Sequence, residues 1–505
     1  MQVPQAIRVS QWTAILAILH PALAGTIHQA HAGDTDFRVP TGERQLFLDD
    51  HGIAKLENLK RTMRQPDKKG AVIRPNWHLG VSSVQVRTAP VWDPEETIFK
   101  FWDCAATPPD LHAAGKACSG YYESHDGLHW SQPALGQIEY ERWPQNNYIS
   151  LVARGRHFRT DYVVFDPTDP DPSRRYKCAL PPTGFAVSPD GRQWRMLPDV
   201  AGVPSSDEAN FSFDAKAKLF ILTVKRGGPH GRSVYLATSR DFQTWTDHGL
   251  IFHADDRDQE LGRETIRARF SDPSFQPLVA NDPARYNVDV YNMGVFRYES
   301  LYIGMPAMYH ATGPSDDGTN TDGFHLIQLA CSRDLKNWIR LGSRQPFIGP
   351  SPRGGGAYDL TGMIGPSNVV VRGDELWFYY TSAKYRRTPA QVDTDRCAIS
   401  LAVLRRDGFI SLDAEATTGQ LTTKPFALKG DQLFVNVVAR KGGQLLAEVL
   451  DVNRKVVATS TPITGDHRRG RLNWNHGDIS DLKGNMVSLR FTLRSASLYS
   501  YWFDD

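Results

Sequence analysis

A seven-residue pattern, Ser-x-Asp-x-x-x-Trp, occurs four times and constrains the fold of this 505-residue chain more than any other feature. The four copies begin at Ser124, Ser188, Ser239 and Ser332, and a degenerate copy, Arg-Arg-Asp-Gly-Phe-Ile-Ser, covers 405–411. Each copy follows a short apolar run, which indicates a strand that enters a tight turn where the Asp accepts backbone hydrogen bonds. Only 12 residues of the chain are Trp, so four matches indicate a repeated structural unit. We expect each Trp to cover its turn, with stacking on a ligand as the alternative.

The segments around these turns are alike. Each contains a strand, a charged turn, an aromatic strand that leads back, and a third strand that enters the repeat. A fourth strand after the Trp completes a four-stranded antiparallel sheet, which is the blade of a propeller. The sequence therefore predicts an all-β protein with a five-bladed β-propeller over 41–414. Within it, the segment 41–65, which contains Asp49 and Asp50, is expected to close the ring by joining the last blade.

Two insertions interrupt the blades, at 252–286 and at 311–322. Insertions in a propeller are usually surface loops at the channel mouth, and we expect loops here. After 414 the pattern changes to strands of a small β-sandwich, 415–505. This accessory domain is interpreted as a packing module. A carbohydrate-binding role through Trp474 and the aromatic run 499–503 is the alternative.

The N-terminus has the pattern of a signal peptide over 1–32. Arg8 supplies a positive charge, residues 12–24 form a short apolar core, and Ala30-His31-Ala32 fits a cleavage site. The apolar run is too short for a membrane span, and no second candidate span follows. The sequence thus predicts a secreted or periplasmic protein that begins near Gly33.

Charge and cysteine content exclude several classes of function. The 58 basic and 56 acidic residues give a net charge of +2 without a long basic block, so nothing indicates nucleic acid as a partner. No Cys/His cluster has zinc-site spacing, and we expect neither a metal nor a cofactor. Cys104 and Cys118 flank one loop and are either disulfide-bonded or free. Cys178, Cys331 and Cys397 lie in apolar strands and are expected to be buried thiols.

A signal peptide, five propeller blades and a trailing β-sandwich together resemble the glycoside hydrolases of families 32 and 43. The runs QLFLDD, SRDxxxW, LRRDGFISL and LTTKPFAL resemble a set of exported bacterial proteins similar to family 32. The resemblance covers the mature chain and implies cleavage of glycosidic bonds in a poly- or oligosaccharide. The Trp-x-Asn-Asp-Pro, Arg-Asp-Pro and Glu-Cys motifs of the invertases are not cleanly present. Only Phe270-Ser271-Asp272-Pro273 echoes Arg-Asp-Pro in part.

Candidate site residues follow instead from an alignment of the blades. Glycoside hydrolysis normally needs two carboxyl groups, and the first strands of the blades converge at one channel mouth. The turns that end these strands contain Asp93, Asp166, Asp214, Arg297 and Arg372. Seven or eight residues earlier lie Gln85, Arg159, Asp207, Asp289 and Gly365.

This alignment predicts Asp207 and Asp289 as the catalytic carboxyl pair. Asp161 is expected to be a third acid on the same side, and Arg159 and Gln85 are expected to contact substrate. Glu208 should face the other way unless a bulge intervenes. Solvated acids at the rim are the structural alternative, and Asp272, Asp359 and Glu264 are further candidates.

Three functional classes remain open at this point. The first is a glycoside hydrolase. The second is a propeller that binds carbohydrate without cleaving it. The third is a sialidase-like enzyme, which the Asp-containing repeat suggests, but the five-blade count and the absence of an evident arginine triad argue against it.

Overall fold

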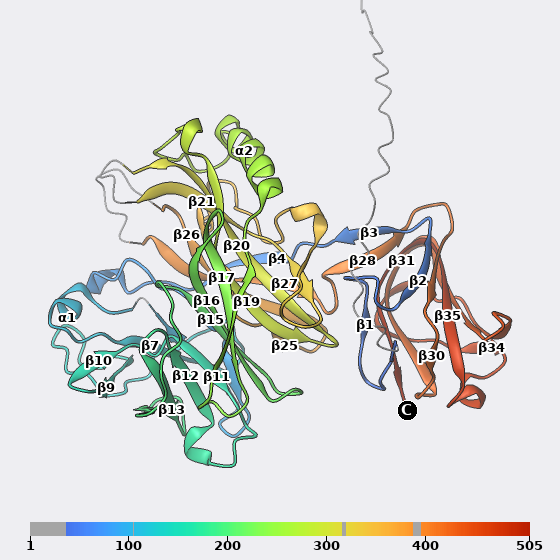
Figure 1. Cartoon of the computed structure of the whole chain (residues 1–505), viewed down its shortest axis with the longest axis horizontal. Coiled ribbons are helices and arrows are strands. Elements are labelled where there is room, and N and C mark those ends of the chain that lie inside the picture. Colours follow the sequence, from blue (N-terminus) through green and yellow to red (C-terminus); the bar gives the residue numbers. More distant parts are fainter. Residues whose placement is uncertain (1–36, 105, 316–319, 387–394) are drawn as a thin grey trace, which may run out of the picture. The chain divides into compact units, whose positions relative to one another are not determined.

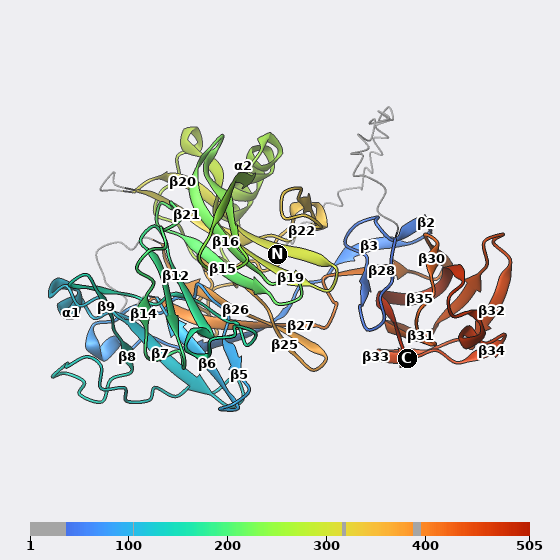
Figure 2. The same cartoon turned by 60° about the horizontal axis from the view of Figure 1, so that its bottom comes forward.

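The computed structural model describes residues 37–104, 106–315, 320–386 and 395–505. The predicted signal peptide, 1–32, lies outside the described residues. The described chain is mostly β-structure and contains the five predicted blades together with a further antiparallel sheet (Figures 1 and 2). The expected fold class is therefore confirmed for the propeller.

Blades one to five follow one another along the chain, and each has three or more consecutive antiparallel strands. Their strands are β5 (Val91–Asp93), β6 (Ile98–Asp103), β7 (Ser119–Ser124) and β8 (Tyr148–Ile149) in blade one; β11 (Tyr162–Phe165), β12 (Tyr176–Leu180), β13 (Gly184–Ser188) and β14 (Arg195–Met196) in blade two; β15 (Ala209–Asp214), β16 (Leu219–Gly228), β17 (Gly231–Ser239) and β18 (Thr246–Phe252) in blade three; β19 (Asn287–Tyr298), β20 (Leu301–Pro314), β21 (Thr321–Ile327), β22 (Ala330–Ser332) and β23 (Ile339–Arg340) in blade four; and β24 (Gly362–Ile364), β25 (Val370–Arg372), β26 (Glu375–Ala383), β27 (Cys397–Arg405) and β4 (Asp67–Ile73) in blade five. Blade one also carries the short helix α1 (Pro109–Ala113), and the hairpin of β9 (Leu151–Ala153) and β10 (Arg156–Phe158) precedes blade two.

The repeat forms the turn that the sequence predicts. In the first copy, Asp126 Oδ1 accepts hydrogen bonds from the backbone N–H groups of Leu128 and His129, both at 2.8 Å. Ser124 Oγ accepts from Gly127 N at 2.8 Å, and Trp130 Nε1 donates to Gly127 O at 3.1 Å. The other three copies repeat the Asp and Ser contacts. The structural interpretation of the repeat is therefore confirmed.

The repeat Trp side chains also join neighbouring blades. The ring of Trp245 stacks on Phe185 of the preceding blade, with centroids 4.5 Å apart and an interplanar angle of 7°. Trp194 likewise packs edge-on against Trp102 of blade one. All four repeat Trp residues are half-buried. They therefore stabilise contacts between blades as well as the turns themselves.

We expect Trp245→Ala to lower the free energy of unfolding by about 2–3 kcal/mol, because the ring is only half-buried; deletion of a fully buried Trp costs ~3–5 kcal/mol. Urea unfolding of the variant and of the wild type measures the difference. Trp92→Ala is the control, since Trp92 is 42% exposed on a short edge strand. An unchanged unfolding midpoint for Trp245→Ala would contradict a role in joining blades.

An N-terminal strand closes the ring, but it lies after the predicted segment 41–65. Strand β4 pairs antiparallel with β27, with Ile73 opposite Ile399. Segment 41–65 instead contributes β1 (Gln45–Leu46), β2 (Ile53–Glu57) and β3 (Lys60–Met63) to the other sheet. An alternating pattern marks a strand but not the edge that it joins, and here the partners lie more than 300 residues away.

The first insertion contains a helix where a loop was expected. Helix α2 (Asp256–Ser271) begins with a reciprocal capping box, in which Asp255 and Asp258 each accept the other's backbone N–H at 3.0 Å. Ile266 is fully buried and anchors the helix in the core. The second insertion extends the β20–β21 hairpin, and of this segment 316–319 lie outside the described residues.

The remaining sheet has 11 strands. They are β1, β2, β3, β28 (Ile410–Ala414), β29 (Gly419–Thr423), β30 (Phe426–Ala427), β31 (Gln432–Leu450), β32 (Val456–Ser460), β33 (Gly465–Arg471), β34 (Trp474–His476) and β35 (Met486–Asp504).

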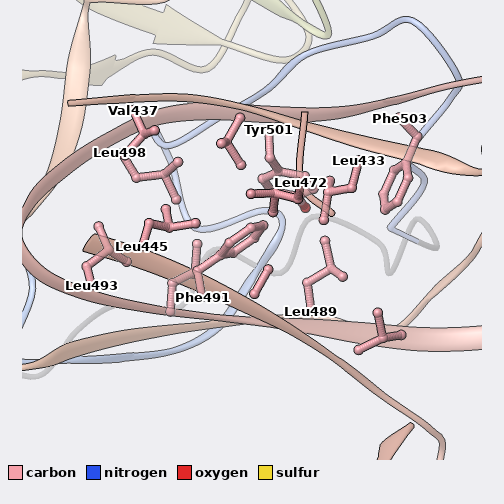
Figure 3. Packing of buried hydrophobic residues seen from close by; sticks show 14 of the residues in the cluster. Leu433, Val437, Leu445, Leu472, Leu489, Phe491, Leu493, Leu498, Tyr501 and Phe503 are labelled. Atoms are coloured by element: carbon pink, nitrogen blue, oxygen red, sulfur yellow. The ribbon is translucent and has the colours of Figure 1, made fainter. Parts of the chain in front are cut away.

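The two longest strands of this sheet, β31 and β35, pair along their length and bend where the register shifts between Ala439 and Gln444. Figure 3 shows Val437 and Leu498 on one side of the enclosed core and Leu445 and Leu493 on the other. The predicted sandwich is thus one sheet that doubles back on itself.

The aromatic run 499–503 packs inside this domain. Tyr501, Trp502 and Phe503 are each about 2% exposed or less, so their rings contribute to the core. Trp474 is half-buried against the same core. The packing interpretation therefore accounts for these aromatic residues, and a sugar platform made of 501–503 is excluded by their burial.

Asp407, from the degenerate fifth copy of the repeat, connects the propeller to the 11-stranded sheet. Its carboxylate is fully buried and accepts hydrogen bonds from Arg44 Nη1, Tyr298 Oη and Ser500 Oγ, each at 2.6 Å. Asn436 Nδ2 adds a contact at 3.3 Å. The chain still turns in the fifth copy, where Gly408 N donates to Arg405 O at 2.9 Å, but the Asp side chain serves as the junction between the two parts.

All five cysteines are buried free thiols. The bonded alternative for Cys104 and Cys118 is therefore not realised, and burial raises the pKa of each of these two thiols to about 12. The expectation for Cys178, Cys331 and Cys397 is confirmed.

Candidate functional site

Hydrogen bonds between blades cross the centre of the propeller. Asn210 Nδ2 donates to Ser367 Oγ at 2.8 Å, and Asn292 Nδ2 donates to Asn210 Oδ1 at 3.0 Å. Ser367 Oγ in turn donates to the backbone carbonyl of Arg87. These four residues come from blades three, four, five and one, and all are buried. They form a polar layer, and the charged residues described next lie on the side of this layer where the first strands begin.

Arg87 and Glu208 form a buried ion pair between blades one and three. Arg87 Nη2 donates to Glu208 Oε1 at 2.7 Å and Arg87 Nε donates to Oε2, and both residues are 5% exposed. Burial opposes the charge on Arg87, but the Glu208 carboxylate outweighs it and raises the pKa of Arg87. The backbone of Glu208 extends β15, since its carbonyl accepts from Lys225 N at 3.0 Å.

Asp161 lies next to this pair on blade two. Ser119 Oγ donates to its Oδ1 at 3.0 Å, and Arg159 Nε lies 3.1 Å from its Oδ2. Burial raises the pKa of Asp161, although Arg159, Ser119 and Arg87 oppose that shift. Asp161 is therefore a carboxyl group that burial favours in its protonated, proton-donating form.

Arg159 and Gln85, the predicted substrate contacts, hold this part of the cluster in place. Gln85 Oε1 accepts from Arg87 Nη2 at 2.9 Å, and its backbone N–H donates to Asp103 Oδ1 at 2.9 Å. Arg159 Nη1 donates to the carbonyl of Cys104 at 2.6 Å. Gln85, Arg159 and Asp161 thus lie in one cluster, and their roles toward a substrate stay predictions.

Asp289 lies on the other side of Glu208, on blade four. Its Oδ2 accepts from Arg232 Nε at 2.7 Å and from Arg232 N at 3.3 Å. Its Oδ1 is buried and has no hydrogen-bond partner among the described residues. Gly231 has φ +111°, and a Cβ there would lie 2.9 Å from Asp289 Oδ2. Glycine at 231 therefore permits the close approach.

Asp207 and Asp289 are not joined by any contact in the described part of the chain. Asp207 pairs with Lys225, and its side chain is 67% exposed. Glu208, one residue later, is the buried acid that reaches blade one. The alignment of the blades selects Asp207 and not Glu208, because strand side chains alternate and a shift of one residue exchanges the two faces.

The three further candidates lie apart from these groups. Asp272 ends helix α2 and is exposed, and Glu264 is exposed on the same helix. Asp359 is buried, where it accepts from Tyr380 Oη at 2.9 Å and pairs with Lys68.

A cavity lies at the opposite ends of β15 and β19. It is a cavity of about 560 Å³ whose charged lining residues are Glu43, Asp214, Lys216, Arg297, Glu299 and Arg406. Its acids already have partners within the protein: Asp214 accepts from Tyr302 Oη at 2.8 Å, and Glu299 from Arg44 N at 3.0 Å. We place the candidate site instead at the starts of the first strands, where buried acids from three consecutive blades gather.

The described residues contain no group of three or more His, Cys, Asp or Glu side chains that could hold a metal ion. No helix in the described ranges is long and apolar enough to cross a membrane.

Burial of His310 makes the free energy of unfolding depend on pH. Burial lowers the pKa of His310 to about 4. Below pH 6.5 the unfolded chain therefore binds a proton that the folded chain does not take up until about pH 4. We expect this residue alone to cost about 3 kcal/mol of unfolding free energy between pH 7 and pH 4. Urea unfolding of His310→Phe, which keeps the stacking on Phe324, should show a correspondingly weaker pH dependence. An identical pH dependence for both proteins would contradict this assignment.

Comparisons with known proteins give only distant structural matches. No family model and no curated protein matches the sequence. Among solved structures, a family 32 β-fructofuranosidase from Bombyx mori matches with a TM-score of 0.39 and 11% identity, covering 86% of this chain and 93% of its own. A family 43 arabinoxylan arabinofuranohydrolase from Bacillus subtilis matches at 0.35 and 9%, covering 86% and 99%. Fructan 1-exohydrolase IIa from Cichorium intybus matches at 0.36 and 9%, covering 86% and 97%.

The chain is thus a distant structural match to the five-bladed propeller glycoside hydrolases of families 32 and 43, at an identity that indicates no particular subfamily. A mutant of the Bombyx mori enzyme was solved in complex with sucrose.

Proposed function

We propose that this protein is an exported glycoside hydrolase whose active site is the charged cluster at the starts of the first strands. One observation carries the proposal: buried acids from three consecutive blades, Asp161, Glu208 and Asp289, each pair there with an arginine, namely Arg159, Arg87 and Arg232. Arg87 pairs with Glu208, and its charge also lowers the pKa of Asp161. The charges of Glu208 and Arg232 both affect the pKa of Lys225, in opposite directions. Two carboxyl groups with different environments are what glycoside hydrolysis needs.

The environments suggest a role for each acid. Asp161, whose pKa burial raises, is suited to protonate the leaving group. Asp289 is suited to act as base or nucleophile, because Arg232 binds one of its oxygens and the other is free of described partners. Asp207, the other member of the pair inferred from sequence, lies beside Lys225 at the exposed edge. Arg159 and Gln85 would position substrate near Asp161.

A carbohydrate-binding propeller without catalysis is the second candidate, and one observation favours it. Arg87 engages both oxygens of Glu208, and Arg232 and Lys225 engage Asp289 and Asp207. Carboxylates held by cations are weaker bases than free ones. In a protein that only binds sugar, these pairs would serve to orient hydroxyl groups.

Hydrolysis assays separate the two candidates. Wild-type protein is incubated with a panel of neutral and acidic plant and algal polysaccharides, and new reducing ends and released oligosaccharides are measured. Release from at least one glycan supports the hydrolase. Binding by affinity electrophoresis without release from any member of the panel would favour the second candidate.

Export is the remaining part of this proposal, and it rests on the signal-peptide pattern that ends at Ala32. We expect protein recovered from the extracytoplasmic fraction of its native host to begin near Gly33. Mass spectrometry of the N-terminal peptide tests this. An intact Met1 terminus on such protein would contradict it.

A further inference from the structure

Three cations from two blades converge on the ring of Tyr291, at the edge of the proposed active site. Lys225 Nζ lies 4.1 Å from the ring centroid, and the guanidinium carbons of Arg232 and Arg386 lie at 5.1 and 5.5 Å. Arg232 and Arg386 also lie 4.6 and 4.3 Å from the ring centroid of Tyr309. Lys225 and Arg232 come from β16 and β17, and Arg386 follows β26 of blade five (Figure 1).

The acids near Tyr291 do not balance these three charges. Asp207 pairs with Lys225 and Asp289 pairs with Arg232, whereas Glu208 is held by Arg87. Arg386 has no carboxylate partner among the described residues. Its Nε donates to the carbonyl oxygen of Thr321 at 3.3 Å. Among the described side chains that contact Tyr291 or pair with those that do, Arg386 is thus the cation without a carboxylate partner.

A buried imidazole lies between the same two tyrosines. The ring centroid of His325 is 4.9 Å from that of Tyr291 and 4.9 Å from that of Tyr309. His325 is 3% exposed, and neither ring nitrogen has a hydrogen-bond partner in the described ranges. Burial and the nearby Arg386, Arg232 and Lys225 hold the pKa of His325 well below its usual range. A neutral imidazole offers one donor and one acceptor, and both are unused here.

Unpaired polar groups in such a place indicate a ligand. A buried donor or acceptor without a partner costs free energy, and a native fold keeps few of them. Together with the charge on Arg386, the unused His325 nitrogens define a subsite with positive charge, hydrogen-bonding capacity and two aromatic rings. Aromatic rings present the apolar face that a sugar ring packs against.

We propose that the cluster of Arg386, Arg232, Lys225 and His325 binds an anionic group on the sugar substrate, either the carboxylate of a uronic acid or a sulfate ester. This inference rests on the proposed function, because it names the substrate class of the same site. Arg386 supplies the charge that the anion pairs with, and a planar guanidinium fits the oxygens of a carboxylate or sulfate in a bidentate way. His325 donates to or accepts from a neighbouring hydroxyl group.

Affinity electrophoresis tests the proposal without requiring catalysis. The probes are polygalacturonate, alginate and carrageenan on the acidic side, and xylan, arabinan, galactan and levan on the neutral side. We expect at least one acidic glycan to retard the wild-type protein more than every neutral one. Rising salt should weaken that retardation, because screening acts on charge pairs. Retardation by neutral glycans alone, or by no glycan in the panel, would overturn the proposal.

Arg386→Gln provides the second test, on the acidic glycan that binds best. Loss of a charged hydrogen-bonding partner should weaken binding by about 10- to 100-fold. Arg240→Gln is the matched control, since Arg240 is also bonded to a backbone carbonyl but lies at an exposed turn of blade three. Circular dichroism and the unfolding midpoint should be unchanged in both variants. Equal affinity of Arg386→Gln and wild type would overturn the proposal.

Chemically matched glycans identify the anion. If free polygalacturonate binds and its methyl ester does not, the anion recognised is a carboxylate. If carrageenan binds and desulfated carrageenan does not, the anion is a sulfate. These outcomes are separate from the test of hydrolysis. Binding of an acidic glycan without cleavage supports the anion subsite and contradicts the proposed hydrolase activity. Cleavage of neutral glycans alone supports the hydrolase activity and contradicts the anion subsite.

Discussion

Asp289→Asn is expected to lower turnover by about 10²- to 10⁴-fold on whichever glycan the wild type cleaves, with the fold intact. Asparagine keeps the shape of the side chain and its contact with Arg232, but it cannot take a proton or attack a sugar carbon. Asp161→Asn should show a loss of the same order, because the amide cannot donate the proton that burial favours on Asp161. Sugar affinity should change far less than turnover in both variants. Steady-state kinetics and equilibrium binding measure the two quantities.

Two further variants make this prediction specific. Asp207→Asn tests the carboxyl pair inferred from sequence. A loss of turnover equal to that of Asp289→Asn would assign Asp207 as the second catalytic carboxyl group. Retained turnover would leave Asp161 as the second catalytic carboxyl group. Asp272→Asn is the control, since Asp272 is an exposed residue at the end of α2. Near-wild-type turnover in both Asp161→Asn and Asp289→Asn would show that the active site lies elsewhere.

Asp407→Asn is expected to lower the free energy of unfolding by about 3–5 kcal/mol, the largest loss that we predict for any single substitution outside the site. The carboxylate is fully buried and neutralises Arg44, whose side chain is only 6% exposed. Asparagine tolerates the positive φ of 62° at this position, so backbone strain should not contribute to the loss of unfolding free energy. The variant removes the carboxylate that pairs with the buried Arg44 guanidinium.

Asp466→Ala is the matched control for this prediction. Asp466 pairs with Arg405 between the same two sheets, but its side chain is 58% exposed. Exposed ion pairs contribute at most ~1 kcal/mol, so this variant should unfold nearly as the wild type does. Urea unfolding followed by Trp fluorescence compares the three proteins. Similar losses in both variants would contradict the assignment of Asp407 as the junction.

The site could be predicted only in part from sequence. The alignment of the strand-ending turns grouped Gln85, Arg159 and Asp161. Each blade repeats the same chain path, so residues at equivalent positions in the blades lie at the same mouth of the channel. It could not decide between Asp207 and Glu208, since a shift of one residue exchanges the faces of a strand. Lys225, Arg232, His325 and Arg386 left no signal, because they come from second and third strands and from loops whose length the repeat does not fix.

The sequence by itself determined the number of blades and the chemistry of their turns. Ser, Asp and Trp at fixed spacing form contacts within seven residues, and such local contacts depend little on the rest of the fold. Only the tertiary structure decided which strand closes the ring, how 41–65 joins the C-terminal sheet, and that Asp407 of the fifth copy pairs with Arg44. These outcomes depend on pairing between segments hundreds of residues apart, where many alternative partners share the same alternating pattern and only burial of a common core distinguishes them.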